Sequence, residues 1–95
     1  MRVVRSLVVG RKGASGVDIE LDDPYVVARH CRISQLDDGT FVVEDLSNTN
    51  GTFIVPGNWN LPWTRLCGRQ TLQPGDRIRV GRTMLPWRAD SHGAS

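Results

Sequence analysis

The chain has 95 residues, of which 39% are hydrophobic and 23% charged, the proportions of one ordinary globular domain. The 12 basic and 10 acidic residues leave a net charge of +2, and no basic run marks a nucleic-acid-binding tail. No apolar segment approaches the ~18 residues of a membrane-spanning helix, and the mixed segment MRVVRSLVVG is unlike a signal peptide. Two cysteines are too few for a disulfide scaffold, so we expect an intracellular, cytoplasmic and reducing location.

Short segments alternate apolar and polar residues and are separated by turn sequences. Asp18–Leu21 alternates acidic and apolar residues, and Arg77–Val80 alternates arginine and aliphatic residues, as strands with one buried face do. No segment carries the spacing of an amphipathic helix over several turns. We therefore predict an all-β chain with strands at Val3–Val9, Asp18–Leu21, Cys31–Leu36, Thr40–Leu46, Thr52–Val55, Gln70–Leu72, Arg77–Val80 and Thr83–Trp87.

The alternation also predicts which side chains face the core. We expect the aliphatic positions to be buried and the charged positions between them to be exposed, because successive strand residues point to opposite faces. The predicted buried set is Ile19, Leu21, Ile33, Ile78 and Val80, and the predicted exposed set is Glu20, Arg77 and Arg79.

Turn sequences and irregular segments set the organisation of the chain. Asp38-Gly39, between two apolar runs, predicts a tight hairpin. Gly57–Gly68 is the least regular segment, and it is either a long loop or a strand with an insertion. We expect residues 1–88 to form the domain and residues 89–95 to be a flexible tail or a truncated linker.

Nothing in the sequence indicates catalysis. No paired carboxylates, activated nucleophile or metal-ligand spacing stands out, so we expect no enzyme activity, no cofactor and no metal. His30 and Cys31 are neighbours on a predicted strand and point to opposite faces, so they cannot form a nucleophile–base pair. Cys67 and His92 do not complete a zinc-binding spacing with them.

Four sequence blocks occur in a fixed order over most of the chain. They are Gly10-Arg11, then Asp18–Val26 followed by His30 and Ile33, then DLSNTNGTF at Asp45–Phe53, and finally LQPGDRIRVG at Leu72–Gly81. This ordered set resembles the forkhead-associated (FHA) domain. The resemblance implies a β-sandwich of two mainly antiparallel sheets with about ten to eleven short strands and binding loops at one end.

The resemblance also implies a phosphothreonine-binding site at the loop end. A phosphate dianion is bound by fixed guanidinium, hydroxyl and amide donors. Arg11 is implied to hold the phosphate and Asn50 the peptide main chain, since an amide donates and accepts at once. From the residues alone, the simpler interpretation is that Arg11 is a solvated arginine at a strand end and that the small polar segment is a turn. The implied binding set is Arg11, Arg29, Ser47, Asn48, Thr49 and Asn50, with Gly10, His30 and Gly51 supporting the loops.

Position 27 departs from the family pattern. With His30 and Ile33 fixing the register, Val27 occupies the place of the family's serine, and Ala28 the place of an arginine or asparagine. A valine cannot donate the hydroxyl hydrogen bond, whose loss to a charged group costs about 1.5–3 kcal/mol, or roughly 10- to 150-fold in affinity. Arg29 is the neighbouring side chain that can compensate.

Other departures concern the start of the chain and the third block. Nine residues precede Gly10, where the family usually has a full strand further upstream, so that strand is cut, short or missing. A missing strand leaves a sheet edge that recruits partners. We therefore expect Met1–Val9 or Leu85–Trp87 to pair with another copy or with upstream chain. Val55-Pro56 replaces the usual asparagine and glycine and precedes the irregular segment.

These observations favour a protein-interaction module in signal transduction that binds a phosphothreonine-containing peptide or protein weakly. The alternative is a phosphate-independent scaffold or assembly domain, which is favoured by Val27, Ala28 and the insertion after Val55-Pro56. A nucleic-acid-binding β-barrel is the remote alternative, favoured by many arginines and three tryptophans. The nucleic-acid interpretation is the weakest of the three, because the arginines alternate with carboxylates and the aromatic content is only 6%. We expect a protein partner and neither nucleic acid nor membrane.

Overall fold

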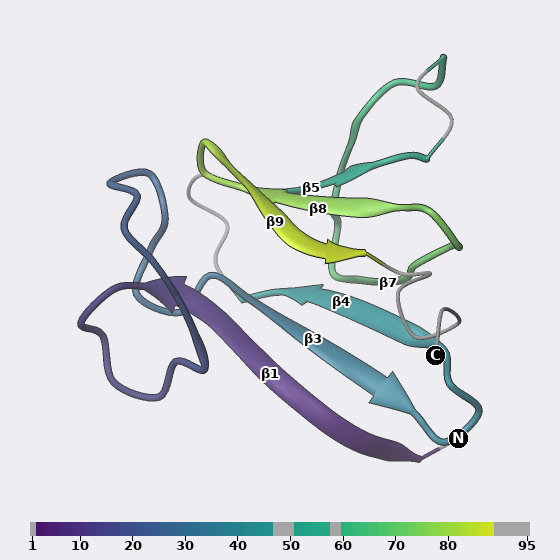
Figure 1. The fold of residues 1–95 in the computed structure, drawn as a ribbon, viewed down its shortest axis with the longest axis horizontal. Helices are drawn as coiled ribbons and strands as arrows, with labels where there is room; N and C mark the ends of the chain where they lie inside the picture. Colours follow the sequence, from purple (N-terminus) through teal and green to yellow (C-terminus); the bar gives the residue numbers. More distant parts are fainter. Residues whose placement is uncertain (1, 47–50, 58–59, 89–95) are drawn as a thin grey trace.

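The computed structural model describes residues 2–46, 51–57 and 60–88, and these form strands and turns arranged in two layers (Figure 1). The predicted all-β sandwich of two mainly antiparallel sheets is confirmed. The described ranges contain nine strands, where the resemblance implies about ten to eleven. No helix long and apolar enough to cross a membrane occurs in these ranges.

The strands divide into a five-stranded and a four-stranded sheet. Their bounds are β1 Val3–Arg11, β2 Ile19–Leu21, β3 Cys31–Leu36, β4 Phe41–Asp45, β5 Thr52–Val55, β6 Thr64–Arg65, β7 Arg69–Thr71, β8 Arg77–Val80 and β9 Thr83–Arg88. The five-stranded sheet has the order β2-β1-β3-β4-β7, and the four-stranded sheet has the order β6-β5-β8-β9. Only β1 and β2 pair in parallel, and every other recorded pair is antiparallel.

The core lies between the sheets and follows the two-residue period of the strands. Ile33 of β3 lies opposite Val43 of β4, and Ile54 of β5 lies opposite Ile78 of β8, and all four side chains are buried. Burying one such side chain contributes about 1.5–3 kcal/mol. The core cluster comprises Val9, Val26, Cys31, Ile33, Val43, Ile54, Leu66, Leu72, Ile78, Val80 and Leu85.

Most of the predicted faces are observed, and three side chains differ. Ile19 and Leu21 are only partly buried because β2 is a three-residue strand at the edge of its sheet. Arg79 is partly buried rather than exposed, because its guanidinium carbon lies 4.9 Å from the ring centroid of Trp63. The positions that match are Ile33, Ile78 and Val80, which are buried, and Glu20 and Arg77, which are exposed.

The Asp38-Gly39 turn joins β3 and β4 as the predicted tight hairpin. Gly39 has a φ of 90°, a conformation that glycine adopts without steric cost. One carboxylate oxygen of Asp38 accepts the backbone N–H of Thr40 at 2.9 Å. This hydrogen bond holds the pKa of Asp38 below its ordinary value.

The irregular segment Gly57–Gly68 contains a strand that the sequence did not predict. The strand β6 pairs with Phe53 and Ile54 of β5, and Leu66, directly after it, is buried in the core. Two residues are too few for an alternating pattern to be visible in a sequence. The segment is therefore a strand with an insertion rather than a simple loop.

Sheet edges decide where a further strand can add. On one side of β1, the strand β3 pairs with it from Val3 to Val9. On the other side of β1, the strand β2 pairs only with Val9–Arg11. The carboxylate of Asp18 accepts the N–H of Val8 at 2.8 Å, just beyond the pairing with β2. In the second sheet, β9 is terminal and has no strand on its outer side within the described ranges. Association through such an edge stays a prediction.

Asp23 connects the chain before β3 to the turn between β8 and β9. One of its oxygens accepts the N–H of Arg82 at 2.8 Å and the hydroxyl of Thr83 at 2.6 Å, and the other accepts the N–H of Tyr25 at 2.8 Å. These hydrogen bonds, led by that of Thr83, hold the pKa of Asp23 below its ordinary value of 3.8. A Cβ at Gly81 would lie 3.0 Å from the same carboxylate, so the turn passes close to it.

We predict that Asp23→Asn lowers the melting temperature at pH 7, because an amide replaces a carboxylate that accepts three hydrogen bonds. A depressed folded-state pKa stabilises the fold above the unfolded pKa and loses this effect as pH falls through the folded value. The difference from wild type therefore shrinks below about pH 4. Asp22→Asn, at an exposed neighbour, is the control with little effect. Equal melting temperatures of wild type and Asp23→Asn at pH 7 would contradict the prediction.

Candidate functional site

The end of β1 lies directly against the connection that precedes β3. The backbone N–H of Arg11 donates to the carbonyls of Val27 and Ala28, at 3.1 and 3.3 Å. A Cβ at Gly10 would lie 2.0 Å from the carbonyl oxygen of Ala28, so only glycine permits this approach. The side chain of Arg11 is exposed at the sandwich end. The predicted phosphate-binding arginine and the departing position 27 are thus immediate neighbours.

His30 is fully buried and bonds to three separate segments. Its backbone N–H donates to the carbonyl of Val9 at 2.8 Å. Its Nδ1 accepts the N–H of Val27 at 3.2 Å, and its Nε2 lies 2.7 Å from the carbonyl oxygen of Gly51. Because Nδ1 must offer a lone pair to Val27, Nε2 carries the proton and donates to Gly51. The imidazole therefore bridges the connection before β3 to the start of β5.

The predicted residues Ser47–Asn50 lie outside the described residues, but both flanking residues are attached to His30. The N–H of Leu46 donates to the carbonyl of His30 at 2.9 Å, and the carbonyl of Gly51 accepts from its ring. Gly51 has a φ of 79°, which favours glycine over other residues. Leu46 and Gly51, which flank this segment in the sequence, are therefore at the same end of the sandwich as Arg11.

Arg29 extends over the loop that follows β1. A Cβ at Gly16 would lie 3.8 Å from Nε of Arg29, so this exposed side chain passes beside that loop. Arg29, Arg32 and Leu46 are the described lining of a hollow of about 250 Å³. The structure thus adds Arg32 to this region, although it is ion-paired with Glu44 at 3.2 Å. Because Cys31 is buried, strand alternation predicts that the side chain of Arg32 points outward. Nothing in the sequence predicted that Arg32 would lie near Arg29.

Positions 27 and 28 of the connection before β3 offer no side-chain hydroxyl to an anion. Val27 is partly buried and Ala28 exposed, and neither carries a polar side chain. The cations near this connection include Arg11 at the end of β1, Arg29 over the loop that follows β1, and Arg82, whose guanidinium carbon lies 4.3 Å from the ring centroid of Tyr25. The groups that this end of the molecule can offer to an anion are therefore guanidinium groups, including that of Arg11 at the end of a strand and that of Arg29 beside a loop.

Cys31 and the acidic residues give no catalytic or metal centre in the described ranges. Burial, aided by the nearby charge of Asp45, raises the pKa of the Cys31 thiol to about 12, so the nucleophilic thiolate is not formed at neutral pH. No group of three histidine, cysteine or acidic side chains that could hold a metal occurs in those ranges. Cys67 is exposed and free.

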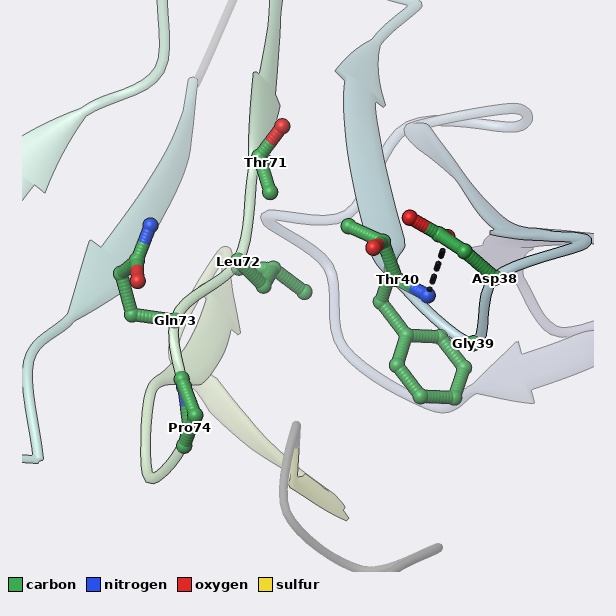
Figure 2. Close-up of a pocket in the computed structure, with 8 residues that line it drawn as sticks. Asp38, Gly39, Thr40, Thr71, Leu72, Gln73 and Pro74 are labelled. Atoms are coloured by element: carbon green, nitrogen blue, oxygen red, sulfur yellow. Dashed lines mark hydrogen bonds between the residues drawn. The ribbon is translucent and has the colours of Figure 1, made fainter. Parts of the chain in front are cut away.

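Figure 2 shows a second hollow, of about 340 Å³, between the β3–β4 turn and the connection after β7. Because β3 runs from His30 toward this turn, the hollow is at the opposite end of the sandwich from Arg11. Asp38 accepts the N–H of Thr40, the N–H of Leu72 donates to the carbonyl of Phe41, and Thr71 and Gln73 also line the hollow. It contains none of the residues that the sequence predicted for binding.

We predict that His30→Ala lowers the free energy of unfolding, because each buried polar group left unpaired, at Val27 and Gly51, costs about 1–3 kcal/mol. Urea unfolding measures the change. Arg29→Ala, at the exposed neighbour, is the matched control and stays within about 0.5 kcal/mol of wild type. An unfolding free energy for His30→Ala as close to wild type as that of the control would contradict the bridging role.

Comparisons with known proteins agree with this arrangement. A family model described as the FHA domain matches residues 7–81. The fold is similar to the FHA domain of the CT664 protein from Chlamydia trachomatis, with a TM-score of 0.72 and 21% identity over 88% of this chain and 76% of that one. No curated protein sequence matches the chain at a significant level.

Two further solved structures are similar and contain partners of their own. The FhaA FHA domain, complexed with the intracellular domain of Rv3910, has a TM-score of 0.64 and 28% identity over 83% of this chain and 75% of that one. The N-terminal FHA domain of Rad53p from S. cerevisiae, in complex with a phosphothreonine peptide, has a TM-score of 0.63 and 27% identity over 85% and 60%. With a family match from residue 7 to residue 81 and a shared sandwich fold, the chain belongs to the FHA-domain family.

Proposed function

We propose that this domain recognises a phosphothreonine in a partner protein and binds it weakly. The observation that carries the proposal is the backbone hydrogen bonding of Arg11 to the carbonyls of Val27 and Ala28. It sets the backbone of Arg11 beside the position where the family has a hydroxyl and this chain has none. FHA domains are protein-interaction modules, and the similar domain of Rad53p is in complex with a phosphothreonine peptide.

Arg11 supplies the main attraction in this proposal. A guanidinium offers a planar fork of donors that matches a phosphate dianion, and it keeps its charge at every physiological pH. Gly10 lets the end of β1 lie directly against the carbonyl of Ala28, which fixes the backbone of Arg11. The guanidinium is therefore attached to a rigid strand end. The backbone of this donor is therefore ordered before binding, and only the side chain loses conformational entropy when it contacts the phosphate.

Val27 weakens the site because it removes one donor from it. A phosphate oxygen facing an aliphatic side chain loses hydration without gaining a hydrogen bond. Arg29, exposed and one residue from buried His30, supplies a second cation that compensates in part. The net expectation is binding that depends on phosphate, falls with salt and has modest affinity.

A phosphate-independent assembly domain is the second candidate. Val27 and Ala28 favour it, since neither side chain can contact a phosphate through a hydrogen bond. Both candidates are interaction modules without catalysis, and they share the same fold. A binding measurement with and without phosphate separates them.

We predict that Arg11→Ala abolishes binding to phosphothreonine peptides and that Val27→Ser strengthens it about tenfold, the equivalent of one added charge-assisted hydrogen bond. Fluorescence anisotropy on a phosphothreonine peptide library and its unphosphorylated counterpart measures both effects. Arg69→Ala, on β7 and exposed, is the matched control and leaves binding unchanged. Two results together would replace the proposal with the phosphate-independent candidate. The best-binding peptide would have to bind wild type equally with and without its phosphate, and it would have to bind Arg11→Ala as tightly as wild type.

A further inference from the structure

The outer face of the four-stranded sheet gathers apolar and arginine side chains in cross-strand register. Phe53 of β5 lies opposite Arg79 of β8, and Arg79 lies opposite Met84 of β9. In the next row, Val55 of β5 lies opposite Arg77 of β8. Their neighbours along the strands, such as Ile54 and Ile78, are buried in the core, so these side chains point away from it. We call this set, together with Trp63, the arginine face.

This face has no carboxylates among its strands. The sequence contains no Asp or Glu between Asp45 and Asp76, and none between Asp76 and Asp90. These two segments include the strands β5, β6, β8 and β9. Asp76 is buried and accepts the N–H of Gln73, and no ion pair between it and Arg77 or Arg79 is recorded among the described residues. By contrast, Arg32 on the outer face of the other sheet is paired with Glu44. The arginine alternation in Arg77–Val80 thus creates a one-sign surface.

Trp63 holds Arg79 in place on this face. The guanidinium carbon of Arg79 lies 4.9 Å from the ring centroid, a cation–π distance, and the tryptophan itself remains 49% exposed. No carboxylate is recorded against Arg77 or Arg79 among the described residues. A guanidinium fixed in this way keeps its edge N–H donors available and loses less conformational freedom when it binds a carboxylate. Leu61, 53% exposed, adds apolar surface two residues before Trp63.

We propose that the arginine face binds an acidic, unphosphorylated segment of a partner protein. Charge complementarity selects the acidic character, because Arg77 and Arg79 present fork donors with no internal counter-charge. The mixture of Trp, Arg, Phe and Met is the composition enriched at protein interfaces, with aromatic and arginine anchors carrying most of the binding energy. The face lies on the outer surface of the smaller sheet, and the proposal does not rest on phosphothreonine recognition.

A protein segment fits this face better than a single-stranded nucleic acid. Nucleic-acid strands are bound by rows of exposed aromatic rings on which bases stack and by a cationic track along the backbone. Here the ring of Trp63 is already covered on one side by Arg79, and Phe53 is partly buried in its row. The remaining fork donors and apolar side chains match carboxylates and aliphatic groups.

The test selects peptides on the full chain from a phage-displayed library of random, unphosphorylated dodecapeptides. The library is first depleted on Arg77→Gln/Arg79→Gln, so that only peptides that need the arginine face remain. We expect the enriched peptides to combine Asp or Glu with Leu, Phe or Trp. Fluorescence anisotropy then measures the best peptide on single variants.

We expect Arg79→Gln and Trp63→Ala each to weaken this peptide about tenfold, as the loss of a charge-assisted contact does. The controls Arg69→Gln on the other sheet and Arg11→Ala at the sandwich end stay within about twofold, near the ordinary effect of a distant surface change. Enriched peptides without acidic residues, or binding that Arg11→Ala removes and Arg79→Gln does not, would overturn the proposal. So would a single-stranded oligonucleotide that displaces the peptide and binds more tightly at 150 mM salt, which would assign the face to nucleic acid.

Discussion

The buried imidazole of His30 is the interaction on which the loop end of this domain depends. One ring nitrogen accepts from the backbone of Val27 and the other donates to that of Gly51, while its own backbone bonds to Val9 and Leu46. A buried polar ring is stable only when both nitrogens are satisfied, so its presence in the core fixes the segments around it. The connection before β3, the end of β1 and the residues on either side of the Ser47–Asn50 segment are all bonded to this one residue.

Arg11 illustrates how this support reaches the surface. Its backbone N–H donates to Val27 and Ala28, which lie in the connection that ends at His30. Gly10 allows the end of β1 to contact this connection. The exposed guanidinium therefore stands on a rigid base although nothing in the described residues binds it. The same rigidity makes Val27 consequential for the proposed phosphate site, since its side chain is held beside that site and has no hydrogen-bond donor.

Charge is distributed unevenly between the two sheets, and this gives the domain two different surfaces. Acidic residues are concentrated before Asp45, where Glu44 neutralises Arg32 on the larger sheet. The smaller sheet carries arginines without carboxylates, and Trp63 orders one of them. A net charge of +2 therefore hides a locally cationic and apolar face, and net charge alone describes solubility better than it describes recognition.

Local sequence determined the strand class, the Asp38-Gly39 hairpin and the buried faces at Ile33 and Ile78, because a period of two and a turn preference act over a few residues. The ordered blocks also identified the family from sequence. Only the tertiary structure decided that Arg11 lies against Val27 and that Arg79 stacks on Trp63. These contacts join residues far apart in the chain, and their register depends on strand pairing and core packing, which no local pattern encodes.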